Sequence, residues 1–142
     1  MTTSILPVSK EQVADLILQA TGDKLTELQW AKFNQFAQAS LLLWSGEFKG
    51  QLLCLWGLIP PTILSDQAYL WLYTTEAAKD HEFVLVRRSQ IELRKMLEAF
   101  PRIVGHCEVG AERSIRWLRW LGARFGEPDG KLIPFVIRGS ND

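Results

Sequence analysis

The stretch "QAYLWLYTTE" constrains the fold most, because its apolar residues alternate onto both faces of an extended strand. Tyr69, Trp71 and Tyr73 fall on one face, and Leu70 and Leu72 fall on the other. A strand that is apolar on both faces must be covered on both, which is typical of a central strand between two layers of helices. We therefore predict a sheet at the centre of the molecule with helices on each side.

The preceding sequence, "LLLWSGEFKGQLLCLWGLIPP", has apolar, β-favouring residues on either side of a short polar segment. We interpret it as a β-hairpin whose turn is "SGEFKG". Pro60 and Pro61 then end the second strand, because neither can donate a hydrogen bond to a neighbouring strand. Trp44 and Trp56, like Trp71, are predicted to lie in the core.

Apolar residues at three- and four-residue spacing predict helices on both sides of this β-rich segment. Ser9 and Gln12 have the form of a capping box at the start of the first helix. The second helix is expected over roughly 25–39 and the third over 82–100, and a fourth ends at Gly122. Strands are expected at "RIVGHCEV" and "LIPFVIRG", with short strands before the first helix and at "ARFGE".

The expected element order is therefore α-α-β-β-β-α-β-α-β, which describes an α/β (α+β) protein. A chain of 142 residues fits one domain with its own core. We expect a single domain over 1–142, with the N-terminal helices in 1–40 and the sheet with its remaining helices in 41–142.

Composition excludes several classes of partner. Sixteen basic and sixteen acidic residues give a formal net charge of zero, which removes any whole-molecule attraction to nucleic acid or anionic lipid. The apolar runs are too short to cross a bilayer as helices, and the N-terminus lacks the pattern of a signal peptide. Two histidines and two cysteines cannot build a classical zinc site without carboxylates. We expect no nucleic acid, membrane or metal partner.

His106 and Glu108 are the candidate catalytic residues, because they alternate onto one face of the strand "RIVGHCEV". In that arrangement one side chain serves as a base for an amine substrate and the other orients it. The alternative is a polar strand face with no chemistry, which is the commoner case. Cys107 points to the opposite face and is expected to be packed in the core rather than nucleophilic.

The segment "A-E-R-S-I-R-W-L-R-W-L-G-A" resembles the pattern "N-E-R-A-I-x-x-Y-x-x-x-G-F" of the GNAT acyltransferase superfamily, in which this strand and helix follow the strand beside the acyl-CoA. The matching residues are Glu112, Arg113, Ile115, Leu121 and Gly122. The resemblance implies a GNAT-like mixed sheet flanked by helices. It also implies that the sheet splays apart to admit the cofactor's pantetheine arm. The Pro60-Pro61 segment is one candidate place for this splay, and the alternative is that these prolines simply end an edge strand.

A second likeness is to the internal virion or head-assembly protein family of short-tailed phages. The segment "V-G-A-E-R-S-I-R-W-L-R-W-L-G-A-R-F", followed by "G-E-P-D-G-K-L-I-P-F-V-I", is similar to that family's pattern of a V-G turn, a helix and a closing strand. Ala123 agrees with the phage form, in place of the GNAT phenylalanine.

Three departures from the GNAT pattern bear on chemistry. Working enzymes hold the CoA pyrophosphate on a glycine-rich loop "[QR]-x-x-G-x-[GA]" at a helix N-terminus, but "TTEAAKDHEFVLVRRSQIELRK" contains no glycine. Ala111 replaces the motif asparagine, and Leu118 replaces the tyrosine that protonates the leaving thiolate. Neither side chain can transfer a proton.

Two functions follow from these resemblances. The first is a phage-encoded virion structural, assembly or host-interaction protein, located in the host cytoplasm or in the virion, with a degenerate acyl-CoA site. The alternative is an active N-acetyltransferase that uses acetyl-CoA in a non-standard way. In the alternative, the residues expected to contact the cofactor are Leu72, Tyr73, Thr74, Arg87, Arg88 and Ser89. The oligomeric state is left open.

A helical wheel places Trp120 among the arginines of its helix. The expected buried face consists of Ile115, Trp117, Leu118 and Leu121, and the opposite face carries Arg113, Arg116 and Arg119. Tryptophan beside arginine is a composition enriched in protein interfaces. We therefore predict a partner surface formed by Trp120, Arg116 and Arg113.

Overall fold

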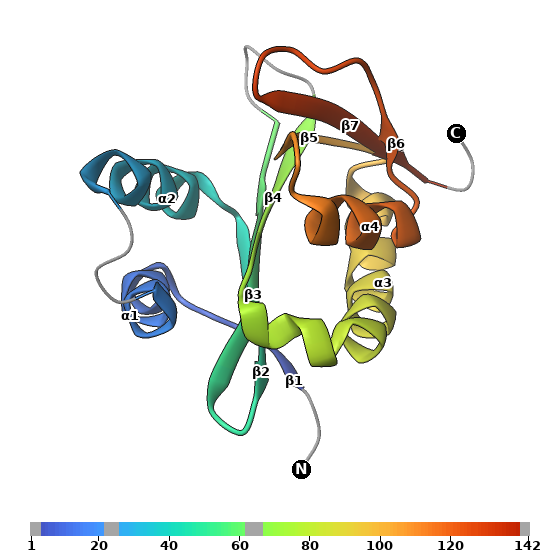
Figure 1. The fold of residues 1–142 in the computed structure, drawn as a ribbon. Helices are drawn as coiled ribbons and strands as arrows, with labels where there is room; N and C mark the ends of the chain where they lie inside the picture. The colour runs from blue at the N-terminus through green and yellow to red at the C-terminus, as the bar shows by residue number, and fades with distance from the viewer. Residues whose placement is uncertain (1–3, 22–25, 62–66, 140–142) are drawn as a thin grey trace.

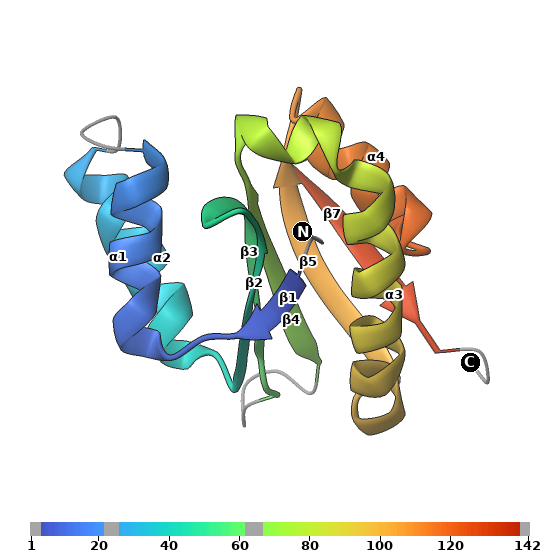
Figure 2. The ribbon, with the colours of Figure 1, turned by 90° about the horizontal axis from the view of Figure 1, so that it is seen from below.

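The computed structural model describes residues 4–21, 26–61 and 67–139. Within them, a seven-stranded mixed sheet carries α1 and α2 on one face and α3 and α4 on the other, as Figures 1 and 2 show. The strands are β1 (Ser4–Pro7), β2 (Leu42–Phe48), β3 (Gln51–Ile59), β4 (Ala68–Thr74), β5 (Arg102–Glu108), β6 (Arg124–Phe125) and β7 (Leu132–Arg138). The helices are α1 (Lys10–Thr21), α2 (Glu27–Ala39), α3 (Glu82–Ala99), α4 (Glu112–Trp120) and a 3-10 helix, η1 (Glu76–Asp80).

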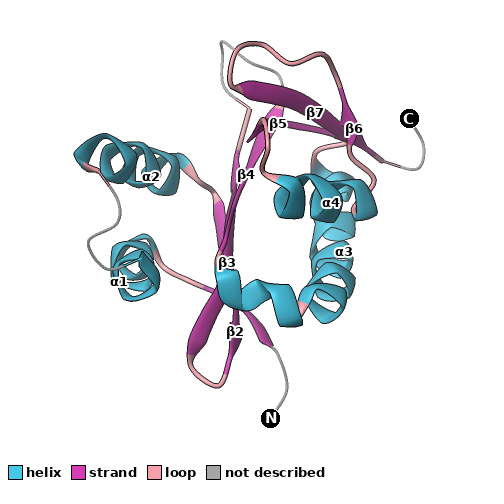
Figure 3. Cartoon of the chain, viewed as in Figure 1, coloured by secondary structure: helices cyan, strands magenta, loops and turns pink. Residues whose placement is uncertain are grey.

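The predicted α+β class and element order are confirmed, including both short strands, and η1 is added before α3. The strands lie in the order β1-β2-β3-β4-β5-β7-β6. Only the β4–β5 pair is parallel, and the other pairings are antiparallel. Figure 3 shows the helices as two separate layers on either side of this sheet.

The two-sided character of β4 is confirmed, because each face packs in a different core. Trp71 is 5 % exposed and packs in the core under α1 and α2 with Val13 and Ile17. Leu70 is 4 % exposed and packs in the core under α3 and α4 with Leu93. The predicted central strand is thus covered on both sides, between β3 and β5.

Local signals set the helix ends as expected. The capping box at Ser9 and Gln12 is present, with the Ser9 N–H donating to Gln12 Oε1 at 2.8 Å. Thr26 forms a second capping box at the start of α2. Gly122 has a φ of +96° immediately after the last turn of α4, where glycine adopts the left-handed conformation without a Cβ penalty.

The predicted hairpin turn is wrong in position. β2 continues through "SGEF", and the chain reverses at Lys49 and Gly50, whose φ angles of +52° and +78° give a two-residue turn. Gly46 lies inside β2, and this strand position requires glycine because a Cβ there would come within 2.7 Å of Cys54 Sγ. The register of β2 against β3 shifts between Gly46 and Glu47. A glycine needed for packing therefore looks, in the sequence, like a turn residue.

The sheet splays apart between β4 and β5. These strands pair only at Ala68–Ile103 and Tyr69–Val104, and their remaining residues make no ladder with one another. Pro60 and Pro61 follow β3, at the end where Ile59 pairs with Tyr69, so they lie away from the splayed end. The suggestion that these prolines mark the splay is therefore wrong; β3 is also internal, so they do not end an edge strand.

Candidate active site

A cleft of about 360 Å³ lies where β4 and β5 diverge. Its walls come from α2, β4, β5, α4 and β7, so five separate segments of the chain meet around it. Parallel strands that lose their ladder leave backbone and side chains facing open space, which is how this sheet forms a concave site. The cleft is the first candidate for a functional site.

Aromatic side chains of α2 and β4 form one wall of the cleft. The Phe33 ring meets the Tyr73 ring edge-on at 5.2 Å, and the Phe36 ring lies 5.9 Å from that of Tyr69. Trp71 is fixed by its indole N–H, which donates to Ser40 Oγ at 2.8 Å. This wall is rigid and apolar, which suits an aliphatic or aromatic group better than a charged one.

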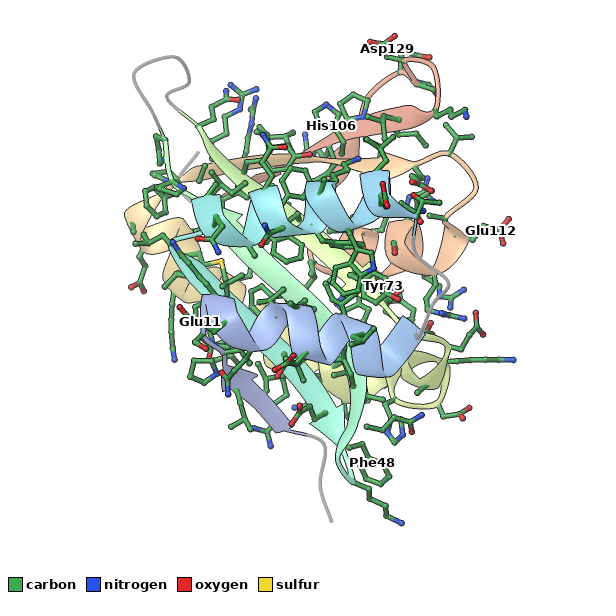
Figure 4. All side chains as sticks on the ribbon, turned by 90° about the vertical axis from the view of Figure 1, so that its left-hand side faces the viewer. Glu11, Phe48, Tyr73, His106, Glu112 and Asp129 are labelled. Atoms are coloured by element: carbon green, nitrogen blue, oxygen red, sulfur yellow. The ribbon has the colours of Figure 1, made fainter. Side chains whose placement is uncertain are left out.

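His106 lies on the α1–α2 side of the sheet together with Tyr73, as Figure 4 shows. Its Nδ1 is 3.2 Å from the hydroxyl oxygen of Tyr69, and both residues line the cleft with Glu108. Burial raises the pKa of Tyr69, and a hydrogen bond with the backbone of His106 partly offsets that shift. The Tyr69 hydroxyl thus stays protonated and can hold the imidazole in one orientation.

The structure brings the two predicted catalytic residues to one face, with both exposed, and buries Cys107 on the other. Burial raises the pKa of the Cys107 thiol, which suits a packed side chain rather than a nucleophile. The catalytic role of His106 and Glu108 remains a prediction. Tyr69 was missed as a site residue, because in the sequence it looks like one more core aromatic of its strand.

The α4 wall of the cleft carries Ala111, Ser114 and Leu118. Leu118 is 2 % exposed, so this position holds a packed apolar side chain. Ser114 supplies the only hydroxyl among these three residues. The two places where the GNAT pattern keeps asparagine and tyrosine therefore offer no group that can donate a proton to a leaving thiolate.

In the GNAT pattern the cofactor's diphosphate lies at the N-terminus of the helix that corresponds to α3, and in this chain a carboxylate lies in the first turn of that helix. Glu82, the first residue of α3, has a side chain only 16 % exposed. Arg116 Nη2 donates to both of its oxygens, at 2.7 and 2.9 Å, and Arg113 Nε lies 3.7 Å from Oε1. These charge-assisted contacts hold the Glu82 carboxylate against α4, and a carboxylate in the first turn of a helix is also favoured by the helix dipole.

Arg113 is held from its other side by the segment before α3. Its Nη1 donates to the Thr75 carbonyl at 3.1 Å, and its Nη2 lies 3.4 Å from Glu76 Oε2. The two arginines therefore face two carboxylates, Glu76 and Glu82, and their positive charge is neutralised within the chain.

The residues here do not fit a CoA diphosphate. The segment from Thr74 to Glu82 has no glycine, so side chains stand where backbone would have to approach phosphate. Glu76, Asp80 and Glu82 balance the charges of Lys79, Arg113 and Arg116, so this helix end has no excess of positive charge to attract a diphosphate. The cleft between β4 and β5, in contrast, has room for a small group.

The six residues predicted to contact a cofactor lie in two separate places in the structure. Leu72, Tyr73 and Thr74 line the cleft. Arg87 and Arg88 are exposed on α3 beyond its first turn, and Ser89 is buried at 4 %. Neither arginine lies at the helix end where backbone N–H groups are free, and a role for this set in binding a cofactor remains a prediction.

Two residues of the predicted partner surface lie together. Trp120 is 48 % exposed, and the Arg116 guanidinium lies 5.8 Å from the centroid of the Trp120 ring. Arg113 is turned toward Thr75 and Glu76 instead, with 24 % of its side chain exposed. Trp117 and Leu118 form the buried face of α4, and Ile115 and Leu121 are partly buried. The interface itself remains a prediction.

Several known structures are similar to this chain over its whole length. The chain superposes on an IAA acetyltransferase from Bacillus cereus ATCC 14579 with a TM-score of 0.68, at 11 % identity, covering 96 % of this chain and 99 % of that one. It superposes on RimL, an alpha-N-protein acetyltransferase in complex with coenzyme A, with a TM-score of 0.69, at 12 % identity, covering 100 % and 97 %. An acetyltransferase of the GNAT family from Streptococcus pneumoniae gives a TM-score of 0.62 at 9 % identity, covering 98 % and 100 %.

The chain has the GNAT fold. No protein-family model and no curated protein sequence matches it, so the likeness is one of structure, at identities that establish the fold alone. The GNAT resemblance of the α4 segment is thereby confirmed at the level of fold. The likeness to the phage family has no support from these comparisons.

Two further properties bear on function. No group of three or more potential metal ligands gathers anywhere in the part of the chain that the structure describes. In the same residues, no helix combines the length and the apolar character needed to span a bilayer.

Proposed function

We propose that this GNAT-fold chain acts by binding a protein partner, and that its cofactor end is closed to CoA by its own residues. The observation that supports the proposal is the Glu82 carboxylate at the N-terminus of α3, held by Arg116 and Arg113. A carboxylate in the first turn of α3 disfavours a phosphate at the same helix end, and the segment before α3 has no glycine that would let backbone approach a phosphate closely.

The partner class follows from the sequence pattern of α4 and the closing strand. Its similarity to internal virion and head-assembly proteins of short-tailed phages supports a structural, assembly or host-interaction role in an infected bacterium. In that role the acyltransferase fold serves as a scaffold, and residues such as Leu118 and Ala111 contribute packing where an enzyme keeps polar groups.

The virion role is tested in a phage that encodes this chain. Mass spectrometry of purified particles and of assembly intermediates is expected to find the chain in a fixed ratio to the capsid protein. Its absence from both, together with an unchanged burst size after deletion of the gene, would contradict the role.

A second candidate, an N-acetyltransferase with a non-standard site, is favoured by the open cleft. Tyr69 and His106 meet in it beside Glu108, which is an arrangement able to accept a proton from an amine. In this case Tyr69 orients His106, and the aromatic wall formed with α2 positions the acceptor.

This candidate is tested by following thiol release from acetyl-CoA with a panel of amines and N-terminal peptides. Turnover that is lost in His106→Ala and reduced in Tyr69→Phe would support the enzyme. If thiol release with every acceptor is no faster than in buffer without the protein, the enzyme is contradicted and only the binding role stands.

A further inference from the structure

The outer face of α3 combines exposed apolar residues with arginines at helical spacing. Phe83, Arg87, Ile91 and Arg94 follow one another at intervals of four, four and three residues, so they form one stripe along the helix. Phe83 is 70 % exposed and Ile91 is 53 % exposed. With Val84 and Arg88 they line a shallow groove of about 440 Å³.

Trp120 extends this surface onto α4. Gln90, which also lines the groove, donates from Nε2 to the Trp120 carbonyl at 3.1 Å, so the two helices are joined at this point. Trp120 is half exposed, and the Arg116 guanidinium covers part of its ring. We call this set the α3–α4 face: Phe83, Val84, Arg87, Arg88, Ile91, Arg94 and Trp120.

The arginines of the α3–α4 face have no carboxylate partners within the described residues. The four ion pairs found there use Lys95, Arg113 and Arg116, and none involves Arg87, Arg88 or Arg94. Arg87 instead lies 5.8 Å from the Phe83 ring centroid. The three arginines thus surround large exposed apolar side chains, and exposed apolar side chains that gather in one patch are typical of interaction sites.

We infer that the α3–α4 face binds an acidic amphipathic segment of a partner protein. Apolar side chains of that segment would contact Phe83, Ile91 and Trp120, and its carboxylates would pair with Arg87 and Arg94. The inference deepens the proposed binding role by naming the surface and the chemistry of the partner. It also moves the centre of the predicted interface from Arg113, which is used inside the chain, to the stripe on α3.

The pattern of charge decides between this occupant and others. A second copy of the chain is disfavoured, because a self-complementary contact would place the arginines of one face near those of the other. Val84 and Ile91 interrupt the cations with aliphatic side chains that cannot stack on bases, which disfavours nucleic acid. An interfacial membrane helix keeps its apolar and charged sides apart, whereas here they alternate along one stripe.

The test measures fluorescence anisotropy of a labelled helical peptide with leucines at one face and glutamates beside them. A second peptide, with lysine in place of each glutamate, is the matched probe. The acidic peptide is expected to bind at least roughly tenfold more tightly than the basic one. Phe83→Ser is expected to lower the affinity for the acidic peptide by roughly tenfold, as is typical when an anchoring side chain of an interface is removed.

Charge reversal gives the sharper result. In the double variant Arg87→Glu and Arg94→Glu, the preference is expected to switch to the lysine peptide, while Leu28→Ser and Lys131→Glu leave both affinities unchanged. Leu28 is 81 % exposed on α2, and Lys131 is exposed near β7, so these controls alter similar side chains away from the face. All four positions are exposed, and circular dichroism checks that each variant is folded.

Several outcomes would overturn the inference. These are equal affinity for the two peptides, no effect of Phe83→Ser, or tighter binding through the same residues to a single-stranded oligonucleotide, to anionic vesicles or to a second copy of the chain. The peptide test is independent of the test for CoA binding. Binding of CoA would contradict the proposed function but not the role of the α3–α4 face, whereas absence of peptide binding would contradict only the role of that face.

Discussion

Gly105 lies where the β4–β5 ladder ends, and its surroundings leave no room for a side chain. It lies in β5 next to Val104, the last residue paired with β4, and a Cβ there would meet the Phe135 ring and come within 2.5 Å of the Leu70 carbonyl. The sequence shows only a glycine within a strand, which indicates close backbone approach without saying to what. The contacting residues come from two other strands.

Gly105→Ala is therefore expected to lower the free energy of unfolding by about 1–3 kcal/mol, because the Leu70 carbonyl is backbone and cannot rotate away. Urea unfolding followed by tryptophan fluorescence measures the change. Gly126→Ala is the control, since its Cβ would come no closer than 3.3 Å to Pro134 Cγ, and a change within about 0.5 kcal/mol is expected. Equal effects of the two substitutions would show that the close approach at Gly105 is absent.

Cys54 makes stability depend on pH at the alkaline end. Burial raises the pKa of its thiol from 9.0 to about 12. Above pH 9 the unfolded chain therefore loses this proton while the folded chain keeps it. The thiol's contribution to stability is complete below pH 9 and is lost as the pH rises toward 12.

Raising the pH from 8 to 10.5 is thus expected to destabilise the native chain by about 2 kcal/mol more than it destabilises Cys54→Ala. Urea unfolding of both proteins at the two pH values gives this difference, and titration of lysines and tyrosines cancels in the comparison. An identical pH response of the two proteins would mean that Cys54 ionises as easily when folded as when unfolded.

At the scale of elements, the proposal that the cofactor end is closed rests on the contact between α3 and α4. Glu82 and Arg116 are separated by 34 residues, so the sequence shows an acidic helix start and an arginine face without linking them. Helical periodicity predicted both helices and their buried stripes, because local spacing determines which side chains share a face. Pairing across helices depends on tertiary packing and was not predicted.

A double-mutant cycle with Glu82→Gln and Arg116→Gln is expected to give a coupling energy of about 1 kcal/mol, because Glu82 is mostly shielded from solvent. The pair Glu92 and Lys95 provides the comparison, since Lys95 is 67 % exposed and the N–O distance is 3.4 Å. Its coupling is expected to be near zero. A larger coupling for Glu92–Lys95 than for Glu82–Arg116 would contradict the closed helix end.

The hairpin shows where local signals mislead. "SGEFKG" contains two glycines, and the sequence gives no reason to prefer one as the turn. Lys49 and Gly50 take the turn because their positive φ angles suit a two-residue reversal, while Gly46 is required inside β2 by Cys54 and Leu85. Both neighbours of Gly46 come from other elements, so this choice depends on packing.

For the whole molecule, the layers and the two-sided sheet were predictable, because β4 is apolar on both faces and the helices on either side are amphipathic. The cleft was not, since it depends on where the parallel β4–β5 ladder ends. The Tyr69–His106 contact joins residues 37 positions apart, and Tyr69 carried no signal beyond its strand pattern. The missing glycines, Ala111 and Leu118 were visible in the sequence. The structure adds the Glu82 carboxylate at the start of α3, after the segment that lacks glycine, and it places Ala111 and Leu118 in the cleft.

The central claim, that this GNAT fold is closed to its cofactor, is tested most directly by calorimetric titration with acetyl-CoA. The absence of a glycine loop, and the pairing of Arg113 and Arg116 with Glu76 and Glu82, predict no heat of binding up to about 1 mM ligand. A dissociation constant in the micromolar range would contradict the claim and favour the acetyltransferase.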